Sequence, residues 1–433
     1  MITTPGYRLP SPRLRFHSAL TSRLATESYQ GLRAHGPFDA SRVRLQPGSL
    51  LFVFPEAESE GARHLWNAVI KGRGNYPGFA RMFRTDIPPG TGKLLAIKDV
   101  GGDVAEAAMI YRESITAWAA ANDRSDPDLA VVLVPHTEHF VSLTPYYEAK
   151  AAFANLGVPT QMVTSELLSD DRQFGWSVAN IALASFAKLG GVPWTVEAPE
   201  AEHDLIIGIG CCEVGSEGQR KRSFGYAVSF ISNGIYRQTW SFTPTADRDT
   251  YQQRLRDAVL GALSEDLDAP PRRVVLHLAK STGGREIDAV SDAIAQAGVS
   301  IPVAYLRLDD SSLWDLADTS TQTFIPAKGM VARLGDRRAL LQPEGESNLG
   351  PPNGPLLVAL DRRSTVEPED FDDLIAQAFR LAHANWRGFN ARATPATLVY
   401  GEQLANLVGH LTDVKTWNPD LLRSALKTRP WFL

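Results

Sequence analysis

The sequence predicts a mixed α/β protein built in two successive parts. Parallel strands are indicated by four apolar runs, each followed by a stretch with helical periodicity: 50–54, 93–98, 129–134 and 160–163. An antiparallel meander is indicated by three later runs with short turns between them: 204–212, 224–231 and 235–242. This change of pattern within 433 residues predicts two domains, because a single hydrophobic core rarely grows to that size.

The first part is expected to form a Rossmann-like domain over residues 46–190. One of its helices carries clear signals, with Thr144 as N-cap, Pro145 at the first helical position and Gly157 at the end. Residues 1–45, rich in Pro, Arg and Ser, are expected to form an extended arm or an edge strand packed on another domain.

The second part is expected to form a ribonuclease-H-like domain over residues 191–433. After the meander, the pattern predicts a helix, a strand, a helix and a strand at about 249–264, 273–279, 285–297 and 302–308. A meander followed by a βαβ unit is the order of that fold. The segment 343–355 is predicted to be a surface connection and not a domain linker.

Composition limits the kind of partner and the compartment. The 44 basic and 49 acidic residues give a formal net charge of −5, so any nucleic-acid surface has to be local. The only cysteines, Cys211 and Cys212, are adjacent in an apolar run, which is typical of core residues. No signal peptide is recognisable and no apolar run reaches the roughly 18 residues of a membrane span, so we expect a cytoplasmic protein with no membrane partner.

Four polar residues of the first part are candidates for an anion site. Tyr146 and Lys150 are four apart, so both project from one face near a helix N-terminus, where free N–H groups attract anions. Gln161 begins the next strand and Lys188 ends the following helix, so we expect both near the carboxyl edge of the sheet, where open α/β folds bind ligands. Spacing alone leaves an alternative open, in which Tyr146 packs between helices and the others are ordinary surface residues.

The same four residues resemble a known motif. They are similar to the Tyr-Lys-Gln-Lys phosphate clamp of the middle (MID) domain of Argonaute proteins, and residues 187–194, AKLGGVPW, resemble the signature that joins MID to the PIWI domain. The resemblance covers roughly residues 46–433 and is to short prokaryotic Argonautes. It implies that Tyr146 stacks on the first base of a guide while Lys150, Gln161 and Lys188 hold its 5′ phosphate. Asn180 is a weaker candidate for the same site.

The resemblance also implies a role for the end of the chain. In that family the terminal carboxylate, with Mg²⁺ or Mn²⁺, completes the phosphate pocket, and this chain ends in Trp431, Phe432 and Leu433. Leu433 is therefore a tentative metal ligand through its carboxylate. Some members have a Gln where Ala184 stands, so the metal and an exposed, frayed tail both remain open.

The carboxylates of an active PIWI domain are missing. The first strand of active members ends in Gly-Ile-Asp, whereas this chain has Gly210 at the Asp position. The second Asp corresponds to Ala279, and only Glu402 matches an acidic position, as a vestige or a cap at the start of its helix. Two-metal hydrolysis needs several carboxylates, so the resemblance implies an inactive PIWI domain.

By resemblance, the expected function is guide-dependent nucleic-acid binding in prokaryotic defence. The expected partners are a small guide RNA, a complementary invader DNA and an effector polypeptide with an APAZ domain, either an NAD hydrolase or a nuclease. One alternative is a metal-dependent guided endonuclease with unconventional carboxylates near Gly210 and Ala279. Another is a sugar- or nucleotide-binding α/β protein with no preference for 5′-phosphorylated oligonucleotides.

Other motifs give weaker predictions. The run of Arg220, Lys221 and Arg222 is expected in a hairpin, either touching phosphates or solvated. Residues 90–93, GTGK, lack the spacing of a phosphate loop and precede a strand. Loop, turn or capping roles are expected for two pairs that lack a complete metal or catalytic set: His136 with His139, and Asp309 with Asp310.

Overall fold

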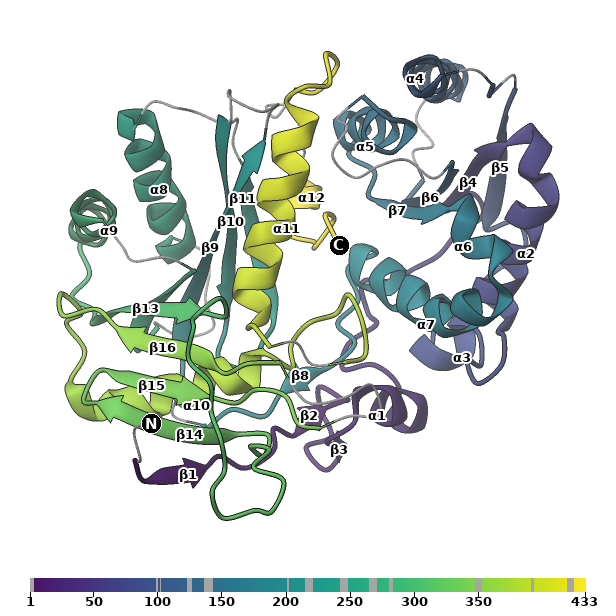
Figure 1. Ribbon diagram of the computed structural model, residues 1–433. Helices are drawn as coiled ribbons and strands as arrows, with labels where there is room; N and C mark the ends of the chain where they lie inside the picture. Colours follow the sequence, from purple (N-terminus) through teal and green to yellow (C-terminus); the bar gives the residue numbers. More distant parts are fainter. Residues whose placement is uncertain are drawn as a thin grey trace.

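The computed structural model describes most of the chain (Figure 1). The described residues are 4–98, 100–101, 103–122, 127–135, 143–200, 202–214, 221–241, 248–264, 271–279, 283–346, 353–390, 393–418 and 424–433. His136, His139 and Arg220 lie outside them. Within the described residues, no helix is both long and apolar enough to cross a membrane.

The first part is a four-stranded parallel sheet in the order β5-β4-β6-β7. The strands are β4 (Leu50–Pro55), β5 (Gly92–Ile97), β6 (Leu129–Val134) and β7 (Thr160–Thr164), as the sequence predicts. Every residue of β4 and β6 is buried, which explains why these two central strands are continuously apolar. The predicted Rossmann-like α/β arrangement is confirmed.

Helices cover both faces of this sheet. α4 (Val104–Ala121) and α5 (Pro145–Leu156) pack on the face that carries Leu51 and Val53. α2 (Ser59–Lys71), α3 (Phe79–Phe83) and α7 (Asp171–Lys188) pack on the face of Phe52 and Phe54, and α6 (Ser165–Ser169) leads into α7. The two faces alternate along β4 because successive side chains of a strand point in opposite directions.

The second part is built on a nine-stranded sheet in the order β1-β14-β15-β16-β13-β12-β9-β10-β11. The predicted meander is β9 (Asp204–Val214), β10 (Lys221–Phe230) and β11 (Tyr236–Ser241). β12 (Arg273–Leu278) and β13 (Val303–Asp309) continue it in parallel to β9, through α8 (Arg248–Leu263) and α9 (Gly284–Gln296). The predicted ribonuclease-H-like order is confirmed.

Three antiparallel strands and three helices complete this part, and of these the sequence analysis expected only the helix that carries Glu402. The strands are β14 (Met330–Gly335), β15 (Arg338–Leu341) and β16 (Leu356–Leu360). The helices are α10 (Phe371–Leu381), α11 (Ala396–Leu411) and the short α12 (Ser424–Lys427). α10 and α11 cover one face of the sheet, while α8 and α9 cover the other. The predicted surface connection falls between β15 and β16.

The N-terminal arm joins the two parts. β1 (Gly6–Arg8) pairs antiparallel with β14 as an edge strand, so the arm packs on another domain as expected. β2 (Leu14–Arg15) pairs with β3 (Leu24–Ala25) and with β8 (Thr195–Val196), and α1 (Ser28–His35) follows. A continuous hydrophobic core includes Phe16 from the arm, Phe186 from α7 and Tyr400 from α11. Burial of this shared core holds the two sheets in one arrangement.

Candidate nucleic-acid interface

Two glycines fix the end of α7 and thereby the position of Lys188. Gly190 has a φ of 94°, a conformation that side chains rarely adopt. A Cβ on Gly191 would lie 2.3 Å from the ring of Phe186. The glycine pair of the AKLGGVPW segment is therefore required by a tight turn, after which the indole of Trp194 donates to the His383 carbonyl at 2.9 Å.

Gln161 and Lys188 lie at the amino end of β7, so the expected position at the carboxyl edge is wrong. β7 begins at Thr160, and the Lys188 Nζ donates to the Thr160 carbonyl at 2.8 Å. The reason is geometric, since α7 follows β7 and runs back across the sheet, which returns its last residue to the amino edge. The site therefore borders the edge strand and not the sheet's usual ligand crevice.

Lys188 is fully buried and bonded only to neutral oxygens. Its second bond, also 2.8 Å, goes to Gln161 Oε1. Burial, followed by the nearby charges of Lys150 and Arg387, holds the pKa of Lys188 well below its usual range. These contacts orient the ammonium group without neutralising it.

Lys150 is buried to 2% exposure and its Nζ makes no hydrogen bond to any described residue. The Nζ lies 5.7 Å from the centre of the Tyr146 ring. Burial, and secondarily the charge of Arg387, lowers the pKa of Lys150 to about 7. An unpartnered buried amine costs free energy, and a ligand that supplies negative charge would remove that cost.

Arg387 is the residue that sequence reasoning missed. It lies between α10 and α11, is exposed, and its backbone N–H donates to Asn385 Oδ1 at 3.0 Å. Its loop lies beside α7, because the N–H of Phe389 donates to Asn180 Oδ1, and its charge lowers the pKa of both Lys150 and Lys188. No spacing rule links a loop arginine to residues about 200 positions earlier in the chain, so no sequence signal was available.

The remaining candidates, Tyr146, Asn180 and Thr144, make different contacts. Tyr146 is partly exposed, and burial raises the pKa of its phenol. Asn180 accepts a hydrogen bond from the Phe389 N–H at 3.3 Å, so it supports the loop that carries Arg387. Thr144 has the extended backbone of an N-cap, as predicted, but its hydroxyl makes no capping bond.

Lys150, Lys188 and Arg387 thus form a cluster, here called the cation cluster. Among the described residues, no carboxylate makes an ion pair with any of the three. Three basic groups, two of them buried on helices of the first part and one exposed on a loop of the second, suit a compact anion whose negative charge would favour their protonated forms. The aromatic ring of Tyr146 beside Lys150 offers a surface on which a base can stack.

The C-terminus is anchored and not frayed. Trp431 and Phe432 are buried, and the Phe432 ring packs against Tyr400 at 5.5 Å between centroids. The Arg429 Nε lies 3.5 Å from the position of a Cβ on Gly190, so the terminal turn lies beside the end of α7 (Figure 1). The predicted anchoring by the apolar tail is confirmed as a structural fact.

Gly210, where the resemblance places the first carboxylate of an active PIWI domain, faces a helix backbone at close range. A Cβ on Gly210 would lie 2.0 Å from the Gly401 carbonyl carbon and 2.2 Å from the Glu402 nitrogen. Two residues earlier on the same face of β9, a Cβ on Gly208 would lie 2.1 Å from the Thr397 oxygen. Both glycines therefore let α11 pack directly on β9.

The remaining carboxylates form an incomplete set. Ala279 follows β12 next to the closed position, because Leu278 pairs with Ile209. Glu402 lies in the second turn of α11, which begins at Ala396, so the suggested role as a cap at the helix start is wrong. Desolvation, and then the charge of Asp310, raises the pKa of Glu402. The described residues contain no group of three or more His, Cys, Asp or Glu suited to a metal ion.

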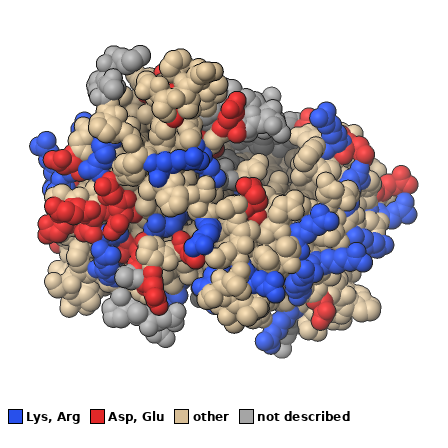
Figure 2. Space-filling model, turned by 90° about the horizontal axis from the view of Figure 1, so that it is seen from below, with Lys and Arg blue, Asp and Glu red and all other residues tan. Residues whose placement is uncertain are grey.

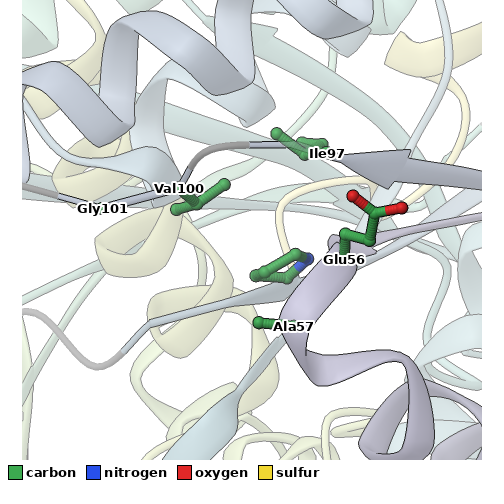
Figure 3. Close-up of a pocket in the computed structure, with 6 residues that line it drawn as sticks. Glu56, Ala57, Ile97, Val100 and Gly101 are labelled. Atoms are coloured by element: carbon green, nitrogen blue, oxygen red, sulfur yellow. The ribbon is translucent and has the colours of Figure 1, made fainter.

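A groove at the carboxyl ends of β4 and β5 differs in character (Figure 3). Its volume is about 660 Å³, and its lining is mainly apolar, with Glu56 as the charged residue: Pro55, Glu56, Ala57, Ile97, Val100 and Gly101. A carboxylate in this position disfavours a phosphate. The cation cluster therefore suits a phosphate better than this groove does.

The weaker motifs have structural explanations. Asp309 caps a turn, accepting from the Ser311 N–H at 3.0 Å, as predicted. Asp310 accepts from the Thr394 hydroxyl at 2.9 Å. Gly92 and Lys93 belong to β5, so a strand follows the GTGK segment, as expected.

Comparison with known proteins shows which proteins the chain resembles. A model of the Piwi domain matches residues 139–284. The Protein argonaute of Cereibacter sphaeroides is 26% identical over 448 residues, which cover 95% of this chain and 57% of that protein. This chain is an Argonaute homologue. The Piwi protein of Archaeoglobus fulgidus is also 26% identical, over 66% of this chain and 71% of its own length.

Solved structures show the same fold. Clostridium butyricum Argonaute, bound to a guide DNA and a 19-mer target DNA, matches with a TM-score of 0.73 at 18% identity, over 94% of this chain and 53% of that chain. Drosophila Piwi matches with a TM-score of 0.68 at 18% identity, over 99% and 56%. The Argonaute homologue thus spans about half the length of several relatives that it matches.

Proposed function

We propose that this Argonaute homologue binds the 5′ phosphate of a small guide in the cation cluster and uses the guide to recognise a complementary strand. The observation that carries the proposal is the Nζ of Lys150, which is buried, has no hydrogen-bond partner among the described residues and lies 5.7 Å from the centre of the Tyr146 ring. A terminal phosphate would accept from Lys150, Lys188 and Arg387, while Tyr146 would stack on the first base.

The proposed guide is RNA and the proposed target is DNA from an invader, in a short prokaryotic Argonaute. The related Clostridium butyricum structure holds a DNA guide and a DNA target, which supports a paired duplex as the ligand. Base pairing then carries the sequence recognition, while the protein contacts the backbone.

We further propose that target recognition does not lead to cleavage by this chain. The closed position at Gly210 and the absence of an acid at Ala279 support this, since metal-assisted hydrolysis needs carboxylates to place the ions. The output would pass to an APAZ-containing effector, a step that rests on the family resemblance alone. Cleavage of the target by the purified chain with Mg²⁺ or Mn²⁺ would contradict this part.

The site's donors fit a divalent cation poorly. The Gln161 oxygen already accepts from Lys188, and the cation cluster supplies positive charge that would repel a metal ion. The Leu433 carboxylate is the remaining expected ligand, and a metal there would add positive charge beside the phosphate. The proposed binding step therefore depends on the lysines and the arginine and not on Mg²⁺ or Mn²⁺.

The test compares 5′-phosphorylated with 5′-hydroxyl RNA and DNA strands at fixed salt. Wild type is expected to prefer the phosphorylated strand, and Lys150→Ala/Lys188→Ala is expected to lose about 100-fold in affinity for it and none for the hydroxyl strand. A matched control is Lys71→Ala/Lys98→Ala, two exposed lysines of the same sheet region. No phosphate preference in wild type would overturn the proposal.

A further inference from the structure

The N-terminal arm differs sharply in charge from the rest of the chain. Residues 1–45 hold seven arginines, no lysine and two acidic residues, a net charge of +5, while the whole chain has −5. Most of these arginines are exposed. The arm therefore carries a local cationic surface on a protein that is otherwise acidic.

Some of the arm's arginines lie beside arginines at the end of α3 and form one patch with them. Arg84 Nη2 donates to the Arg33 carbonyl at 3.3 Å, and the Arg23 guanidinium lies 3.5 Å from His35 Nδ1. Arg81 lies one turn before Arg84. Arg23, Arg33, Arg81 and Arg84 are here called the arginine patch. Figure 2 shows the molecule from below. Lys and Arg prevail on its right side, where α1 and α3 lie, whereas Asp and Glu gather at the left edge.

The arginine patch is not neutralised from within the described part of the molecule. None of its four guanidinium groups makes an ion pair with a described carboxylate, whereas Arg13 and Arg73 pair with Glu197 and Asp171. Exposed arginines without partners leave a positive potential that attracts polyanions. Fold stability therefore does not account for the patch.

A basic connection leads from the patch toward the cation cluster. Residue Asp39 bridges to Val192, so the arm runs beside the turn that follows Lys188. The Cβ of Arg42 lies 3.5 Å from the position of a Cβ on Gly190, where Arg429 also approaches. Positive charge thus continues from the end of α7 onto the arm.

We propose that the arginine patch binds the phosphate backbone of nucleic acid that extends beyond the cation cluster. Guanidinium groups form planar, bidentate contacts with phosphate oxygens, and an all-arginine surface suits that geometry. A protein partner is less well matched, because interfaces between proteins depend on buried apolar anchors and the patch has none among its four residues. This contact extends the proposed function but does not depend on the 5′ phosphate.

The test measures binding of 5′-phosphorylated strands of increasing length, single and paired with a complement, over a range of salt. For the longer strands, Arg23→Gln/Arg33→Gln/Arg81→Gln is expected to lower the slope of log affinity against log salt by about 2, since each lost phosphate contact removes about 0.7 to 0.9. Short strands are expected to bind as in wild type. Arg84 is retained because it lies in a left-handed conformation at the end of α3.

The control is Arg285→Gln/Arg338→Gln/Arg362→Gln, which removes the same charge from exposed sites of the other sheet. An equal loss in this control, or an unchanged slope in the patch variant, would overturn the proposal, including the case in which the patch binds an acidic protein. A patch-dependent slope together with no phosphate preference would support the patch and overturn the guide pocket instead.

Discussion

The cation cluster and the glycine-lined part of β9 differ in how their space is filled. At the cation cluster, neither lysine contacts a counter-ion within the described part of the chain: Lys150 has no hydrogen-bond partner there, and Lys188 donates to two neutral oxygens. At β9, the backbone of α11 fills the space in front of Gly208 and Gly210. The first region has polar groups with unmet bonding capacity, and the second has no room for one.

The difference separates binding from catalysis in physical terms. A buried amine with no counter-ion among the described residues is a cost that a folded protein can avoid with an apolar residue, so its presence supports the proposed phosphate ligand. A glycine in van der Waals contact with a helix backbone indicates packing. The closed region therefore contributes to stability, and the open one is available for binding.

The largest expected effect concerns Gly210→Asp. Because its Cβ would overlap the backbone at Gly401, we expect a loss of about 3 kcal/mol or more in the free energy of unfolding, with no gain of cleavage. Urea denaturation measures the first and a target-cleavage assay the second.

Ala279→Asp is the matched control, since it adds the other missing acid at a half-buried position after β12. We expect it to cost about 1 kcal/mol or less. If Gly210→Asp were as stable as wild type, α11 would not occupy the position closely, and the comparison between the two regions would fail.

Replacing Lys150, whose amine has no partner among the described residues, should raise the free energy of unfolding. We expect Lys150→Met to stabilise the free protein by about 2 kcal/mol at neutral pH, because it removes a buried charge and keeps the volume. Wild-type stability should also rise with pH above about 7, since the unfolded chain keeps the proton on Lys150 that the folded chain has lost. Urea denaturation between pH 6 and 9 tests both. Burial also lowers the pKa of Lys188, which adds a slope of its own, so a slope as steep in Lys150→Met as in wild type would contradict the assignment.

Affinity for a 5′-phosphorylated strand should fall as pH rises, in contrast to the free energy of unfolding. A phosphate ligand needs the protonated amine, so affinity for a 5′-phosphorylated strand should fall above about pH 7, by at most about tenfold per unit. The 5′-hydroxyl strand serves as the control, because its binding does not require that proton. Equal pH profiles for the two strands would separate Lys150 from the phosphate.

The sequence predicts much of this architecture for identifiable reasons. Buried parallel strands such as β4 and β6 are continuous apolar runs. The glycine pair after Lys188 marks the end of a helix. β14 to β16 escaped prediction because they are short and are held by pairing with each other and with β1 and β13, which a local sequence pattern does not show.

The candidate site was predicted only in part, for a different reason. Lys150 and Lys188 stand on helices whose ends can be read, but Arg387 reaches the cluster through tertiary packing of a loop. The closure at Gly210 was also invisible, because a glycine in the sequence shows a missing side chain and not the backbone that takes its place.

Arg387 offers the finest test of how the two sheets share the cation cluster. Because it is exposed, Arg387→Gln should weaken binding of a 5′-phosphorylated strand by only about tenfold at low salt, and less at high salt. Its charge lowers the pKa of Lys150, so its removal should also move the fall in affinity to higher pH. Arg362→Gln, another exposed arginine of the same part, should change neither quantity. If Arg387→Gln also left both unchanged, the phosphate would be held by α5 and α7 alone, and the second sheet would contribute only the anchored C-terminal turn.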